Sequence, residues 1–245
     1  MDYKKELKIF NLNKIALLSI LLFALCFAAG ALVNLLAFRR PLLLTDKVYW
    51  DIIITLAIMA VGVIAHEGLH ALGAMIFGKC KKENISFGFI PRQLMFYCHA
   101  EAPMKASAYK TMLLLPVIIT GFIPFVLSVC LGNIFLVVAF AMLISGGAGD
   151  LIMAASLRKI PASALLLDHP KAPAYYLLYK SDALPENFNE VTPEQEEALL
   201  KSMREKPLSD SSRGRNNLLK ILAIFIFLAF VVLAVFLIAL LMKLF

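Results

Sequence analysis

A long, mostly apolar run from Trp50 to Gly78 contains the motif His66-Glu67-Gly68-Leu69-His70. The run is long enough for a helix to cross the roughly 30 Å hydrocarbon core of a bilayer. Ionisable side chains are costly at that depth, so they mark a functional site. In a helix, His66 and His70 lie one turn apart on the same face, with Glu67 beside them. The sequence therefore predicts a metal site built inside the membrane.

The composition is typical of an integral membrane protein, because 61% of the 245 residues are hydrophobic and only 17% are charged. Five stretches reach the length that a spanning helix needs. We therefore expect an all-α membrane protein, a bundle of about five transmembrane helices. The stretches are residues 14–38, 50–78, 109–131, 133–157 and 218–241.

The formal net charge of +7 raises the question of a nucleic-acid partner. If the N-terminus is cytoplasmic, however, twenty of the 24 Lys and Arg residues fall in segments on the cytoplasmic side. The positive-inside rule predicts this orientation, which accounts for the basicity. No basic patch alternates with stacking aromatic residues, so we expect no nucleic-acid partner.

Residues 79–108 do not have a helical pattern. Ile85, Phe87 and Phe89 alternate with Ser86 and Gly88, which predicts a short β-hairpin-like loop after the second helix. A free strand edge there would be able to pair with an extended peptide. An ordinary interfacial loop is the alternative.

The third apolar stretch contains Pro116 and Pro124, which should kink or loosen its helix. The kink could open a cavity beside the motif helix. Alternatively, these prolines are simply an instance of the higher proline frequency of membrane helices.

The motif itself favours zinc chemistry. Zinc in a hydrolase usually takes three protein ligands and leaves one position for water. His66 and His70 supply two imidazoles, and Glu67 is placed to take a proton from the water as general base. A polar cluster that joins helices through hydrogen bonds is the structural alternative for the two histidines.

Asp150 is the expected third metal ligand. In the orientation above, the second and fourth stretches run in the same direction. His66 lies 16 residues after Trp50, and Asp150 lies 17 residues after Asn133, so both are about 25 Å below the outer boundary. The small residues 145–149 would let the two helices approach closely. A helix-bridging aspartate without a metal is the alternative.

Three further residues are candidates for supporting the site or positioning a substrate. His99 lies in the predicted hairpin, where it could instead be solvated. Asp168 and His169 follow the fourth stretch, and they could fold back towards the site or cap a turn.

These residues together resemble the zincin peptidases of bacterial membranes over about Val61–Tyr179. More distantly, the chain is similar to the site-2 proteases, which cleave membrane helices using HExxH on one helix and an aspartate on another. The likeness implies that His66, His70 and Asp150 bind zinc while Glu67 is the acid/base. Site-2 proteases carry Asn-Pro-Asp-Gly around the aspartate, a pattern that this chain lacks. The matching segments are His66–Leu72, Phe96-Tyr97-Cys98, Leu115-Pro116, Gly149-Asp150-Leu151 and Asp168-His169-Pro170.

The apolar stretches and the polar segment between the last two of them predict three parts of the chain. Residues 1–180 should form a membrane-embedded, metalloprotease-like core, and residues 218–245 should form a C-terminal transmembrane helix. Between them lies a cytoplasmic polar segment, residues 181–217, that contains a short helix and a linker. Thr192-Pro193-Glu194-Gln195 predicts the start of that helix, which should cover about residues 193–205.

We therefore expect a membrane-embedded zinc endopeptidase of the bacterial cell membrane, with its active site nearer the cytoplasmic face. Its cofactor would be Zn²⁺, and its partners would be the bilayer and a membrane-protein or peptide substrate. Two alternatives stay open. One is a non-catalytic metal-binding assembly or transporter-accessory protein, with the metal shell closed by His99, His169 or a cysteine. The other is a zinc-dependent lipid hydrolase.

Overall fold

The computed structural model describes residues 3–42, 47–90, 95–169 and 172–180, and short pieces at 184–185, 188, 190–192 and 194–198. The chain forms two compact units, Met1–Val191 and Thr192–Phe245. The C-terminal helix predicted over residues 218–245 and the linker before it lie outside the described residues, so the three-part division stays a prediction. Thr192 and Gln195 form the expected reciprocal cap, and residues 194–198 are helical.

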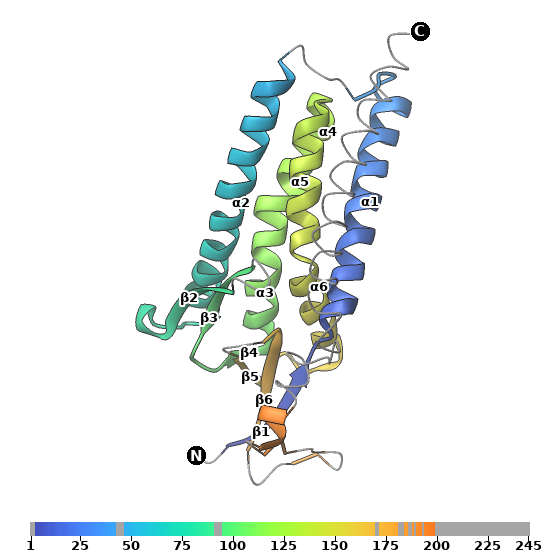
Figure 1. The fold of residues 1–245 in the computed structure, drawn as a ribbon. Coiled ribbons are helices and arrows are strands. Elements are labelled where there is room, and N and C mark those ends of the chain that lie inside the picture. The colour runs from blue at the N-terminus through green and yellow to red at the C-terminus, as the bar shows by residue number, and fades with distance from the viewer. Residues whose placement is uncertain are drawn as a thin grey trace, which may run out of the picture. The chain divides into compact units, whose positions relative to one another are not determined.

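Three described helices are long and apolar enough to cross a membrane. They are α1 (Leu12–Leu36), α2 (Val48–Ile76) and the continuous helix Ala106–Leu131. A fourth candidate is a pair of helices, α5 (Ile134–Gly146) and α6 (Ala148–Ser156), which is bent by 41° where the two meet. Figure 1 shows these helices side by side in one bundle.

The prediction of an all-α bundle of five helices is wrong. The structure contains two antiparallel sheets, of four and two strands, and three or at most four of its described helices reach spanning length. The larger sheet has the order β1-β6-β5-β4. It joins the chain's beginning to residues far along the sequence, because Ile9 pairs with Ala174. The strands of this sheet are β1 (Tyr3–Ile9), β4 (Met104–Lys105), β5 (Leu165–Asp168) and β6 (Ala174–Lys180).

The smaller sheet is the hairpin expected after the second helix. It pairs β2 (Ile85–Ile90) with β3 (Met95–Ala100) in an antiparallel register, with Phe87 opposite Cys98. Phe87, Phe89 and Phe96 are exposed on it. The hairpin and the four-stranded sheet lie at the same end of the helices (Figure 1).

The third span changes its hydrogen-bonding pattern between its two prolines. α3 (Ala106–Pro116) leads into a π-helical turn, η2 (Val117–Phe122), and α4 (Ile123–Leu131) follows. Prolines remove helix hydrogen bonds, and π turns inside helices are frequent at functional sites. The two prolines therefore flank an irregular turn within a helix that continues through both of them.

The core lies where the four-stranded sheet meets α3 and α6. Tyr109 of α3 and Tyr175 of β6 are both fully buried there, with ring centroids 5.8 Å apart. Met104, Leu166 and Met153 belong to the same cluster. This core fixes α3 and the end of β5 relative to each other, which positions the side chains described next.

Candidate metal centre

Two histidines of α2 and one aspartate of α6 converge in the interior of the bundle. The candidate ligand atoms of His66, His70 and Asp150 all lie within 4.8 Å of one another. Asp150 Oδ2 is 3.1 Å from His66 Nε2, and Asp150 Oδ1 is 3.4 Å from His70 Nε2. Both histidines are largely buried, with 9% and 7% of their surface exposed. The structure thus brings together the three residues that the sequence singled out as ligands.

The orientation of each imidazole is set by a hydrogen bond from its other nitrogen. His70 Nδ1 lies 3.0 Å from the main-chain oxygen of Met112, so Nδ1–H donates to that carbonyl. His66 Nδ1 lies 3.4 Å from Thr120 Oγ1. The Thr120 hydroxyl itself donates to the Pro116 carbonyl, so its oxygen is the acceptor for His66. Both Nε2 atoms are therefore left as lone-pair acceptors that face Asp150.

This arrangement fits a divalent cation. Two imidazole lone pairs and a carboxylate are all acceptors, so their convergence in a buried site is unfavourable unless a positive charge lies between them. Two nitrogens and an oxygen form a common catalytic ligand set for zinc. Hydrogen bonds from the distal imidazole nitrogens, here to Met112 and Thr120, are the usual support of metal-bound histidines. His66, His70 and Asp150 are thus suited to hold zinc.

The close approach of the α5–α6 bend to η2 depends on Gly147, which lies between α5 and α6. A Cβ atom at Gly147 would lie 2.6 Å from Val117 Cγ2 and 3.5 Å from His66 Cε1. Asp150 follows three residues later, in the first turn of α6. The absence of a side chain at Gly147 therefore allows the start of α6, which carries Asp150, to pack against η2.

Replacing Gly147 by alanine is expected to lower both thermal stability and zinc affinity, because α6 must move away from Val117. Overpacking of this kind typically costs about 1–3 kcal/mol. Thermal unfolding and a zinc competition titration would measure the two effects. Gly146→Ala is the matched control, since a Cβ atom at Gly146 meets no atom within 4 Å. Equal losses in the two variants would contradict the packing argument.

Glu67 lies beside the cluster without belonging to it. Its side chain is half-buried and interacts electrostatically with His70, His66 and Asp150. The carboxylate also interacts with the backbone N–H of Cys98 on β3. A carboxylate held at the edge of a metal site, outside its ligand set, is free to exchange protons with a water there.

The three supporting candidates lie outside the cluster, and two of them contact each other. His99 Nδ1 is 3.1 Å from Asp168 Oδ2, and the Tyr109 hydroxyl donates to Asp168 Oδ1 at 2.8 Å. His99 is therefore buried rather than solvated. His169 is also buried, with its ring 5.3 Å from that of Tyr176, and it is not in the metal cluster.

Sequence reasoning missed Tyr109, Met112 and Thr120. Thr120 could have been found from the sequence, because it is a polar residue between the two prolines of an apolar helix. Tyr109, a polar aromatic residue at the start of that helix, was a weaker candidate. Met112 could not have been found, since it contributes only its main-chain oxygen.

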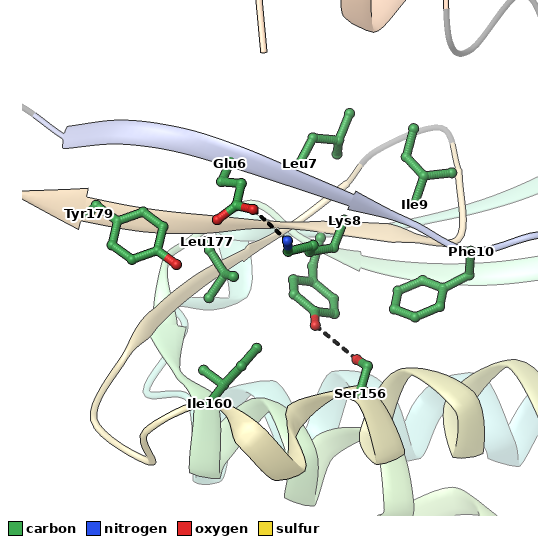
Figure 2. Close-up of a pocket in the computed structure, with 10 residues that line it drawn as sticks. Glu6, Leu7, Lys8, Ile9, Phe10, Ser156, Ile160, Leu177 and Tyr179 are labelled. Carbon is green, nitrogen blue, oxygen red and sulfur yellow. Dashed lines mark hydrogen bonds and ion pairs between the residues drawn. The ribbon is translucent and has the colours of Figure 1, made fainter. Parts of the chain in front are cut away.

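A pocket of about 560 Å³ lies away from the metal cluster, between the β1–β6 pair and α6 (Figure 2). The Glu6 carboxylate in it forms an ion pair with Lys8, and the Tyr175 and Ser156 hydroxyls hydrogen-bond to each other at 2.8 Å. None of the three clustered residues lines it, so this pocket is not the metal site.

The described residues thus combine helices long and apolar enough to cross a membrane with a candidate metal site at the HExxH motif. Residues 59–165, a little under half of the chain, match the model of the putative zincin peptidase family. The matched range includes the whole cluster, Glu67 and His99, and it ends before Asp168. No curated protein and no solved structure matches the chain.

Proposed function

We propose that this protein is a membrane-embedded zinc endopeptidase that hydrolyses peptide bonds of membrane-associated proteins. One observation carries the proposal: His66, His70 and Asp150 converge from two spanning segments, with Glu67 beside them. The match of residues 59–165 to the putative zincin peptidase family supports zinc-dependent peptidase activity.

Different residues would bind the metal, transfer the proton and orient the ligands. Bound by His66, His70 and Asp150, zinc would activate a water molecule and polarise the scissile carbonyl. The Glu67 carboxylate accepts the proton of the attacking water and delivers it to the amine that leaves. The backbone N–H of Cys98 restrains that carboxylate. Met112 and Thr120 hold the imidazoles in the tautomer that presents Nε2 to the site.

A catalytic site is favoured over a closed structural one by the number of ligands. Structural zinc sites usually have four protein ligands, whereas catalytic sites have three. Among the described residues, the cluster holds three. His99, a candidate fourth ligand, is paired with Asp168 instead. Burial raises the pKa of the Cys98 thiol to about 12, and this cysteine does not belong to the cluster of candidate ligands.

The surroundings of the site support a membrane-associated substrate. His66 lies ten residues before the end of α2, which places the site about 15 Å from that end of the helix. The hairpin lies at this end and exposes three phenylalanines. An extended substrate segment would pair with a hairpin edge and reach the site from there. The positive-inside prediction makes this the cytoplasmic end.

Chelation tests the proposal directly. The full-length protein, purified in detergent, should cleave a fluorogenic peptide that carries one apolar spanning segment. Treatment with EDTA should abolish cleavage, and added Zn²⁺ should restore it. A phospholipid substrate in the same assay is the control for lipid hydrolysis. Cleavage that persists in EDTA-treated, zinc-depleted protein would contradict the proposal, as would turnover of the phospholipid but not of the peptide.

A further inference from the structure

The side chain of Asp168 links two elements that each support a different residue of the HExxH motif. We propose that Asp168 is a positioning residue, holding α3 in place through Tyr109 and β3 in place through His99. Through α3 it orients His70 for metal binding, and through β3 it orients Glu67 for proton transfer. The second of these roles rests on the proposed peptidase function, whereas the first concerns metal affinity alone.

Both oxygens of the Asp168 carboxylate are occupied, and by different elements. Oδ1 accepts a hydrogen bond from the Tyr109 hydroxyl at 2.8 Å, and Oδ2 lies 3.1 Å from His99 Nδ1. Tyr109 is fully buried, His99 is 6% exposed, and the Asp168 side chain is 14% exposed. A hydrogen bond to a charged acceptor in such surroundings contributes more than an exposed one, and loss of either partner leaves a polar group unpaired.

The link through α3 leads to His70. Tyr109 and Met112 are three residues apart, so they lie one above the other on the same face of α3. The Met112 carbonyl accepts the hydrogen bond of His70 Nδ1 at 3.0 Å. Here α2 and α3 are in close contact, because a Cβ atom at Gly73 would lie 3.0 Å from Met112 Cα. A rotation of α3 would therefore move the carbonyl that orients the His70 imidazole.

The link through β3 leads to Glu67. His99 is the residue after Cys98, whose backbone N–H interacts with the Glu67 carboxylate. The His99 side chain contacts Asp168, while the backbone N–H of the residue before it contacts the Glu67 carboxylate. The His99–Asp168 pair thus fixes the strand segment that restrains the general base.

The link through α3 predicts a loss of zinc affinity, and the link through β3 predicts a loss of kcat. Tyr109→Phe removes only the hydroxyl, so zinc affinity should fall, by at most the roughly 10–100-fold that follows loss of a direct hydrogen-bond partner of a metal ligand. His99→Leu should lower kcat by about tenfold or more, with KM and zinc affinity unchanged, because proton transfer at Glu67 is impaired. His99→Asn keeps an N–H donor near the position of Nδ1, so it should recover most of the lost kcat.

Tyr175→Phe is the matched control. Tyr175 is a buried tyrosine in contact with Tyr109, but its hydroxyl pairs with Ser156 and not with Asp168. All variants are prepared as full-length protein in detergent. Zn²⁺ affinity is measured by competition with a chromophoric chelator, kcat and KM with the fluorogenic peptide, and thermal stability in parallel.

The expected result is a weakened zinc affinity in Tyr109→Phe but not in Tyr175→Phe, and a lower kcat in His99→Leu with affinity retained. Equal zinc affinities in the two tyrosine variants would overturn the link through α3. Failure of His99→Asn to recover kcat would overturn the link through β3. If even the wild-type protein cleaves no peptide while Tyr109→Phe still loses affinity, the proposed function fails and the metal-orienting role of Asp168 stands.

Discussion

Replacing Glu67 by glutamine is expected to abolish peptide cleavage while zinc stays bound. Glutamine has nearly the same shape, but it cannot accept a proton from the attacking water. Loss of a general base typically lowers kcat by about 10²–10⁴-fold. Glu67 is not among the clustered ligands, so the zinc content should remain that of the wild type. Steady-state cleavage of the fluorogenic peptide and elemental analysis of the same preparations measure the two quantities.

The specificity of this effect is checked with Glu101→Gln. Glu101 is an exposed carboxylate just after β3, where Ser86 Oγ donates to it at 3.5 Å, and it does not belong to the metal cluster. Its replacement should leave both cleavage and zinc content unchanged. Undiminished cleavage by Glu67→Gln would assign the proton transfer to another group, and loss of zinc from that variant would make Glu67 a ligand.

The membrane helices were predictable because their signal is local. A run of about 20 apolar residues has few other stable structures, so the expected boundaries of the first two helices agree with α1 and α2 to within about two residues. The hairpin was predictable for a similar reason, since alternation within one segment predicts a strand. The cap at Thr192 also depends only on four consecutive residues.

The four-stranded sheet was missed because its pairing is not local. β1 is Tyr3–Ile9, a segment with three lysines that looks like a charged cytoplasmic tail. It becomes a strand by pairing with β6, which lies more than 160 positions later. A signal was present in β6 itself, since Ala174–Lys180 contains three tyrosines, residues that are enriched in strands. No signal identified its partner.

The candidate site was predictable because the position of a residue along a spanning segment gives its depth in the membrane. His66 and His70 follow from helical spacing, and comparison of positions along two parallel spans placed Asp150 at the same level. The bend of 41° between α5 and α6 was not expected. Asp150 nevertheless reaches the histidines, because it lies only three residues beyond that bend. The contacts of Asp168 with Tyr109 and His99 could not be predicted, since they depend on how the four-stranded sheet packs against α3.

Asp150→Ala should lower zinc affinity by more than the roughly 100-fold expected when an outer partner of a ligand is removed. The substitution deletes the only carboxylate of the cluster and leaves two neutral imidazoles. Two nitrogen ligands alone do not provide the three protein ligands that catalytic zinc sites use. Cleavage should be lost at ordinary zinc concentrations, because the site is no longer filled.

Thermal unfolding separates this loss of binding from a loss of folding. A ligand that binds only the folded state stabilises it by about 4 kcal/mol when its concentration is 1,000 times Kd. Added Zn²⁺ should therefore raise the melting temperature of the wild type but not that of Asp150→Ala. Asp51→Asn is the control, since Asp51 lies in the first turn of α2, fifteen residues before His66. If zinc stabilises Asp150→Ala as much as the wild type, the convergence of α2 and α6 is not a metal site, and the carboxylate serves only to join the two helices.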